Sequence, residues 1–385
     1  MSCNGKTRGP PNRRSSRTHR MMNANPWSTS HSGPAGPSRA RRSFLLAAAP
    51  VCALVSMAWI ASGAGCQGSD PNPGVRPASG AQPSIPGMSG LALLDDSTYL
   101  VIHDGHGPAE PRAAILELQS AAAPAYLALE IRDERLPGGP LNDLESIAAI
   151  PGRASEFLLL ESGASGEGGG GRRILAHVRL TNGAPRELRL LAWQDVRPQT
   201  DRLSNCEAII CWPGDGQTRL AIADRGRGKG DVLRAELCAG VVSFSGGAGD
   251  AGATLNFEPF PPDSPSIPAA IEVGVGGTGT WRGCSDLFLD ARQALWGVCT
   301  QDLGDRGPFR SRIYRVGSMS PEGRLTTFPA QTVYEVDGFK LEALAACTLP
   351  HAGLCAGSDD EVYGGAWRPF ADPPALSVPI PGKTP

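Results

Sequence analysis

Acidic residues recur at matching places of a repeated two-strand pattern, where together they could bind a cation. The first strand of the pattern begins at or close to an acid in four copies: Glu145, Glu207, Asp286 and Glu342. The second strand ends at further acids: Asp104, Asp224, Asp359 and Asp360. Carboxylates brought close together repel, so they either have raised pKa values or share a bound cation. An all-oxygen ligand set favours Ca²⁺, and the alternative is that each acid caps a turn of its own repeat.

Basic residues accompany these acids and indicate an anionic substrate. Arg202, Arg282 and Lys340 precede three of the first strands, and Arg225 follows Asp224 directly. Guanidinium groups beside a carboxylate-bound cation would stabilise the negative charge that develops when a phosphate ester is hydrolysed. The alternative is that these side chains are solvated or paired. No Gly-x-Ser-x-Gly motif accompanies them, so a serine nucleophile is not indicated.

Five copies of the two-strand pattern predict the fold. The first strands begin near residues 89, 145, 207, 285 and 342, and this spacing leaves room for four strands in each unit. Apolar strands alternate with polar turns, and no long helical stripe interrupts them. We therefore predict an all-β protein, a β-propeller of five or six four-stranded blades over residues 87–381, with a β-sandwich as the alternative. In a propeller the first strands line the central channel, which would gather the acids at one mouth.

The motifs of the repeat resemble those of a known family. The Glu-x-[Leu/Ile] strand, the Asp-x-Gly exit and the segment 358–365, Ser-Asp-Asp-Glu-Val-Tyr-Gly-Gly, are similar to phytase-like and esterase-like β-propeller proteins exported by bacteria. The resemblance spans about residues 87–370. It implies a calcium-dependent hydrolase of phosphate or carboxylic esters, or a non-catalytic relative that binds a protein, glycan or cation through its acidic face. Ser89 and Gly90 stand where the first unit would carry an acid, and Asp286 is displaced by one position.

The formal net charge of -2 combines two unlike segments. Residues 1–65 contain nine Lys or Arg and no acid, which leaves 27 basic and 38 acidic residues in the remainder. An acidic body argues against a nucleic-acid partner, because phosphate contacts need a positive surface on the folded part. The basic segment ends in Arg41-Arg42 followed by the apolar run 44–61. We interpret residues 1–65 as an export signal, either of the twin-arginine type or an ordinary secretory signal.

The apolar run leads to a cysteine that resembles a bacterial lipidation site. Cys66 follows Ser-Gly-Ala-Gly at residues 62–65, although Gly63 stands where an aliphatic residue is usual. Lipidation of Cys66 would make the protein a periplasmic or cell-envelope lipoprotein. Cleavage at a neighbouring small residue, or a retained membrane anchor, are the alternatives. Residues 66–86 are rich in Pro, Gly and Ser and predict a tether that holds a monomeric domain away from the membrane.

Seven cysteines follow Cys66, and in an exported protein they indicate disulfides. Each of two pairs brackets the first hairpin of a unit, and we expect them to form cross-strand bridges: Cys284 with Cys299, and Cys347 with Cys355. Three more cysteines cannot all pair within the chain: Cys206, Cys211 and Cys238. Of these, Cys211 with Cys238 is the favoured pair. Buried free thiols are the competing interpretation if the chain folds before it is oxidised.

Overall fold

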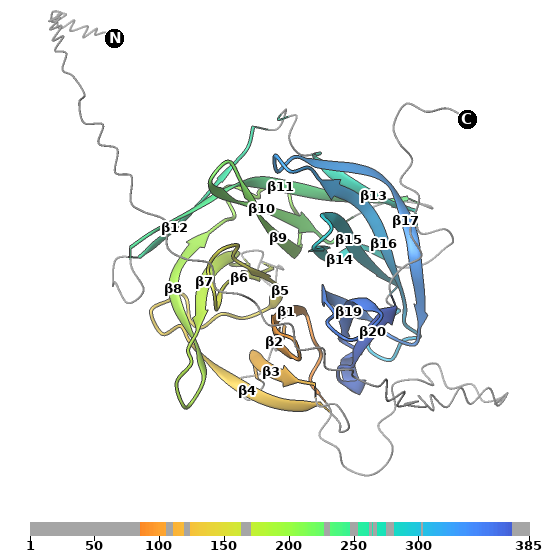
Figure 1. The fold of residues 1–385 in the computed structure, drawn as a ribbon, viewed down its shortest axis with the longest axis horizontal. Coiled ribbons are helices and arrows are strands. Elements are labelled where there is room, and N and C mark those ends of the chain that lie inside the picture. Colours follow the sequence, from red (N-terminus) through yellow and green to blue (C-terminus); the bar gives the residue numbers. More distant parts are fainter. Residues whose placement is uncertain are drawn as a thin grey trace, which may run out of the picture. The chain divides into compact units, whose positions relative to one another are not determined.

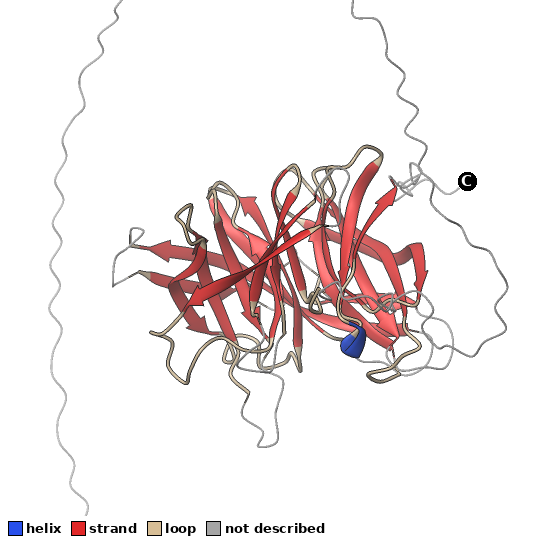
Figure 2. Ribbon diagram, turned by 90° about the horizontal axis from the view of Figure 1, so that it is seen from below, coloured by secondary structure: helices blue, strands red, loops and turns tan. Residues whose placement is uncertain are grey.

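The computed structural model describes residues 85–104, 111–118, 124–162, 171–226, 232–246, 253–261, 264, 268–274, 281–301 and 303–371. The predicted export signal, Cys66 and the tether up to residue 84 lie outside these residues. Nearly every described element is a strand, apart from one short 3-10 turn, η1 (Glu361–Tyr363), as Figure 2 shows. No helix in the described part of the chain has the length and apolarity needed to cross a membrane.

The strands form five consecutive groups around a central axis (Figure 1). The first two groups are β1 (Gly90–Asp95), β2 (Thr98–Ile102), β3 (Ala113–Glu117) and β4 (Ala125–Arg132), then β5 (Leu144–Ala149), β6 (Glu156–Glu161), β7 (Ile174–Leu180) and β8 (Glu187–Asp195). The third is β9 (Cys206–Gly214), β10 (Gln217–Asp224), β11 (Val232–Ser245), β12 (Thr254–Pro259) and β13 (Ala270–Gly274). The last two are β14 (Trp281–Leu289), β15 (Ala294–Gln301), β16 (Arg310–Met319) and β17 (Leu325–Asp337), then β18 (Leu341–Ala346), β19 (Ala352–Ser358) and β20 (Trp367–Ala371).

The innermost strands close into a ring, which makes the fold a five-bladed β-propeller. Each contacts its two neighbours in the order β1, β5, β9, β14, β18 and back to β1. The predicted propeller is therefore confirmed and the β-sandwich alternative is wrong. The fifth blade has three strands in the described residues. Residues from before β1 reach it, because Ile85 bridges Gly365 and the Met88 N–H donates to the Ser358 carbonyl at 2.9 Å.

Five apolar clusters fill the five gaps between neighbouring blades. Strand β6 shows how the sequence supports this packing. Leu159 faces the cluster shared with the first blade, whereas Leu158 and Leu160 face the cluster shared with the third. Because alternate side chains of a strand point to opposite faces, an inner strand buried on both faces must be apolar throughout. This explains the continuous apolar runs that marked the repeat.

A buried carboxyl connects the innermost strands across the channel. Asp286 on β14 accepts a hydrogen bond from the Ser146 hydroxyl on β5 (3.1 Å) and one from the Leu344 N–H on β18 (2.7 Å). Ser146 in turn accepts the Ile209 N–H of β9 at 3.0 Å. Burial raises the pKa of Asp286 well above its ordinary value, against the opposing effect of the hydrogen bonds from Leu344 and Ser146. This brace joins four of the five blades at one level of the channel.

Removing the brace should weaken the ring as a whole. We expect Asp286→Ala to lower the free energy of unfolding by about 2–6 kcal/mol, because it leaves two buried donors without an acceptor at about 1–3 kcal/mol each. Asp286→Asn should cost clearly less, because the amide has nearly the same shape and its oxygen can still accept one of the two hydrogen bonds. Urea unfolding at pH 7 measures both variants. An Asp286→Ala protein as stable as the wild type would contradict the proposed role.

Candidate functional site

β-bulges set the positions of three predicted acids. In β5, β9 and β18 the pairing with the second strand skips one residue, and the skipped residues are Glu145, Glu207 and Glu342. A bulge re-aims the side chain of the extra residue, and bulges are common beside functional sites. The three glutamates thus stand at one register position, one residue before the level of Ser146 and Asp286, at the polar mouth of the channel.

The same register position in the other two blades carries serines. Ser89 precedes β1 and accepts the Asp104 N–H through its hydroxyl at 3.0 Å. Ser285 lies in a longer irregularity of β14, and its buried hydroxyl has no hydrogen-bond partner within the described residues. The mouth ring therefore consists of Ser89, Glu145, Glu207, Ser285 and Glu342. Beyond the brace the channel is apolar, with a cavity of about 190 Å³ between side chains such as Leu91, Ile147 and Leu287.

Two glutamates of the mouth ring are paired with cations. Glu207 Oε1 accepts from both Nε and a terminal nitrogen of Arg225 at 2.7 Å, and from the Asn205 side-chain amide at 2.6 Å. Glu342 Oε1 accepts from Arg282 at 2.8 Å and from Lys340 Nζ at 3.1 Å. The predicted substrate-binding groups Arg225, Arg282 and Lys340 are thus the partners of the acids.

The third glutamate is buried without a partner. Glu145 is 7% exposed, and no hydrogen bond or ion pair to its carboxyl is found within the described residues. Burial, and then the charges of Glu207 and Glu342, raise the pKa of Glu145 well above its ordinary value. Burial also raises the pKa of Glu207 to about 7, against the opposing effect of Arg225. The mouth ring therefore combines an acid that holds its proton more tightly than an ordinary glutamic acid with a carboxyl group whose titration midpoint lies close to neutral pH.

Lys340 extends the cluster to the exit of the last blade. Its ammonium group contacts Asp359 at 3.4 Å and pairs with Glu361. Burial raises the pKa of Asp359 to about 7, and the charge of Glu342 adds to this effect. Asp104 lies near enough to raise the pKa values of both Glu145 and Asp359. The predicted residues Asp104, Asp359 and Lys340 therefore do lie close to the three glutamates.

Other predicted site residues stabilise turns within their own blades. Asp224 accepts the N–H groups of Gly226 (3.0 Å) and Glu236 (2.9 Å), and Asp360 accepts from the Lys340 N–H and the Ser358 hydroxyl, both at 2.7 Å. Arg202 donates to the Leu237 carbonyl. For Asp224 and Asp360 the capping alternative describes the observed role, and Arg202 is paired with a backbone carbonyl. Asp286 bonds to other blades in the brace, so it neither caps a turn of its own repeat nor joins the glutamates as a ligand.

The described side chains do not form a calcium site. No group of three or more His, Cys, Asp or Glu residues in the described part of the chain is arranged to hold a metal ion. Arg225 occupies one oxygen of Glu207, and Arg282 and Lys340 occupy one oxygen of Glu342, so cations already stand where Ca²⁺ would be bound. The predicted calcium ion stays a prediction, and this arrangement gives it no support.

The seven described cysteines are free thiols, so the structure does not contain the predicted bridges Cys284–Cys299 and Cys347–Cys355, nor Cys211–Cys238. The bulge explains the first case, because Cys284 falls among residues of β14 that have no partner on β15, whereas Cys299 faces Arg312 on β16. Cys347 and Cys355 do interact, and a hydrogen bond from Cys355 lowers the pKa of the Cys347 thiol to about 6.

Comparisons with known proteins show likeness in structure alone. No protein-family model and no curated protein matches the sequence. A thermostable family-43 glycoside hydrolase shares 8% identity over 74% of this chain and 88% of its own, with a TM-score of 0.41. An endo-arabinase from Bacteroides thetaiotaomicron shares 12% identity over 76% and 98%, with a TM-score of 0.40. These likenesses carry no conclusion about activity, and the resemblance to phytase-like and esterase-like proteins holds for the propeller fold alone.

Replacing the unpaired acid should change how stability depends on pH. Folded Glu145 keeps its proton at pH values where an unfolded glutamic acid has lost it, so the protein loses stability as the pH rises from the unfolded pKa through the folded one. We expect the melting temperature of Glu145→Gln to fall less than that of the wild type between about pH 5 and about pH 8. The exposed Glu258→Gln is the matched control. Parallel pH profiles for wild type and Glu145→Gln would contradict the raised pKa.

Proposed function

We propose that the protein is a hydrolase whose active site is the mouth ring and whose acid catalyst is Glu145. The observation that supports this most directly is the contrast between Glu145, which is buried, unpaired and has a raised pKa, and Glu207, which is held beside a guanidinium group. Carboxyl groups in environments that separate their pKa values are a recurrent way to obtain a general acid and a general base in one site.

The proposed reaction uses these two groups in turn. The Glu145 carboxyl donates its proton to the oxygen of the leaving group as the bond to that oxygen breaks. A water molecule attacks the atom from which the leaving group departs, and a proton of this water passes to Oε2 of the Glu207 carboxylate. Oε2 is the oxygen available for this, because Arg225 and Asn205 both donate to Oε1. Proton exchange with solvent restores both groups. Arg225 holds Glu207 in place and favours its ionised form.

Partly exposed cations favour an anionic substrate. The side chains of Arg225 and Arg282 are 32% and 20% exposed, so each pairs with a buried glutamate and still presents part of its guanidinium group to solvent. We therefore propose phosphate and carboxylic esters as the first substrates to test. Glycosides belong in the same panel, because an acid paired with a carboxylate is also the usual equipment for glycosidic hydrolysis.

A non-catalytic propeller that binds a partner through this face is the second candidate. The full pairing of Glu207 and Glu342 with Arg225, Arg282 and Lys340 favours it, because these pairs leave few groups free to act on a substrate. The two candidates differ in whether the protein turns over a substrate and whether that turnover requires Glu145.

Turnover of a panel of nitrophenyl esters, phosphates and glycosides tests the proposal. We expect Glu145→Gln to lower kcat by about 10²–10⁴-fold, the usual effect of removing a general acid. The wild-type rate should rise as the pH passes about 7, where Glu207 loses its proton, and fall again where Glu145 does. The exposed Glu258→Gln should leave the rate unchanged. Absence of turnover for every substrate class would leave the binding function, and equal rates for wild type and Glu145→Gln would remove the catalytic role. Chelation with EDTA in the same assay tests the predicted calcium ion.

From the sequence alone we also propose export and lipid attachment at Cys66. Expression in a bacterial host and mass spectrometry of the N-terminal peptide should show a diacylglycerol adduct on Cys66, and Cys66→Ser should release the protein from the membrane fraction. An unmodified, membrane-free wild type would contradict both proposals.

A further inference from the structure

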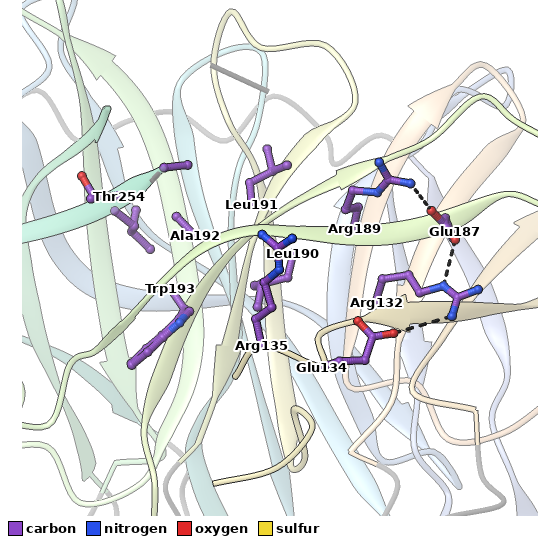
Figure 3. A pocket seen from close by; sticks show the side chains of 12 residues that line it. Arg132, Glu134, Arg135, Glu187, Arg189, Leu190, Leu191, Ala192, Trp193 and Thr254 are labelled. Atoms are coloured by element: carbon purple, nitrogen blue, oxygen red, sulfur yellow. Dashed lines mark hydrogen bonds and ion pairs between the residues drawn. The ribbon is translucent and has the colours of Figure 1, made fainter. Parts of the chain in front are cut away.

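A groove outside the channel lies between the outer strands of the second and third blades (Figure 3). Its cavity volume is about 880 Å³. Strand β8 supplies one wall, the start of β12 supplies the other, and the turn that follows β4 closes one end. The glutamates of the mouth ring line no part of it.

The outer edge of β8 is only partly paired. Strand β4 runs parallel to β8 and pairs with it over three residues, Glu187–Arg189. The chain then leaves the sheet because Asp133, the next residue, pairs with Arg112 at 2.5 Å and accepts the Leu141 N–H at 2.7 Å. Strand β8 continues to Asp195, so no strand in the described residues pairs with its outer edge beyond Arg189. An unpaired edge presents backbone N–H and C=O groups.

The facing edge of β12 forms backbone hydrogen bonds with a side-chain amide of β8. The Gln194 side chain accepts the Phe257 N–H at 2.6 Å and donates to the Phe257 carbonyl at 3.4 Å. These backbone groups therefore point away from β11, and by the two-residue period of an antiparallel ladder the N–H and C=O of Leu255 point the same way. Leu255 lies in the groove. Both walls thus offer backbone donors and acceptors to a ligand that has the same groups.

The charge of the groove selects the side chains of such a ligand. Arg132 and Arg189 share Glu187 at 3.0 and 2.7 Å. Arg135 has no ion pair within the described residues, and Figure 3 shows it between Trp193 and the Arg132 pairs. Trp193 is 37% exposed. A free guanidinium group and an accessible aromatic face favour an acidic chain that also carries apolar side chains.

We infer that this groove binds an extended, acidic peptide segment of a partner protein, which adds as a strand beside β8. The main chain of the peptide pairs with the edge of β8 beyond Arg189, where the pairing with β4 ends, and its acidic side chains contact Arg135 and Arg189. Strand addition suits an edge of this kind, because backbone hydrogen bonds hold the peptide while alternate side chains determine specificity. A polysaccharide lacks the alternating N–H and C=O groups that the two edges require.

The test uses a fluorescein-labelled octapeptide of alternating Val and Glu, with fluorescence anisotropy as the readout. We expect saturable binding to the wild type, no binding of the corresponding Val-Lys peptide, and no binding of a Val-Glu peptide that is N-methylated at every second residue. Arg135→Glu should weaken binding by about tenfold or more, a change of about 1.4 kcal/mol. The exposed Arg292→Glu, on a turn of the fourth blade, is the matched control and should bind like the wild type.

Several results would overturn the inference. These are no binding of the Val-Glu peptide, equal binding of the N-methylated peptide, and equal affinity of Arg135→Glu and wild type. Binding of polygalacturonate in place of the peptide, with the same dependence on Arg135, would assign the groove to an acidic glycan instead. Self-association in sedimentation velocity that Arg135→Glu abolishes would assign it to a second copy of this chain.

Discussion

The channel mouth depends on one buried carboxyl, that of Asp286, which connects four of the five blades. Asp286 accepts hydrogen bonds from β5 and β18, and Ser146 passes the connection on to β9. An inner strand of a propeller has neighbours in its own blade, yet nothing in that pairing determines its height relative to the other blades. The brace sets this height for four strands, and the glutamates one residue further along then meet at one level. Burying this carboxyl is costly, and it is tolerated because both of its oxygens accept hydrogen bonds.

The mouth ring itself works against stability. Three carboxyl groups are brought together by bulges, and only two of them receive cationic partners. Glu145 remains without a counterion in a buried place, which costs free energy that the apolar clusters between the blades must offset. Unfavourable placement of an ionisable group in an otherwise well-satisfied fold is typical of functional sites. The brace therefore stabilises the channel, whereas the mouth ring costs stability that the rest of the fold must offset.

The sequence predicted the fold better than the site. Apolar runs such as Leu158–Leu160 are continuous because both faces of an inner strand are buried, so the repeat was visible without a structure. The convergence of Glu145, Glu207 and Glu342 also followed from the repeat. The partners of these acids did not follow, because Arg225 comes from the exit of one blade and Arg282 reaches Glu342 from another. The bulges at Glu145, Glu207 and Glu342 leave no signature in residue type. A sequence signal did exist for Ser285. The acid of the fourth repeat, Asp286, comes one position later than the glutamates of the other repeats, so Ser285 occupies the position that corresponds to those glutamates.

The contact between the first and last described strands has a consequence for how the chain is made. One of the five apolar clusters joins the first blade to the fifth, and Met88 is completely buried within it. A chain emerging from the ribosome has all of the first blade long before β18 to β20 exist. Until then the arc of four blades ends in two apolar surfaces that have no cover, one on the first blade and one on the fourth. Such surfaces attract each other between chains as readily as within one. The nascent protein is therefore most exposed to chaperones, and to misassembly with a neighbouring copy, after the fourth blade has formed and before β18 to β20 are made.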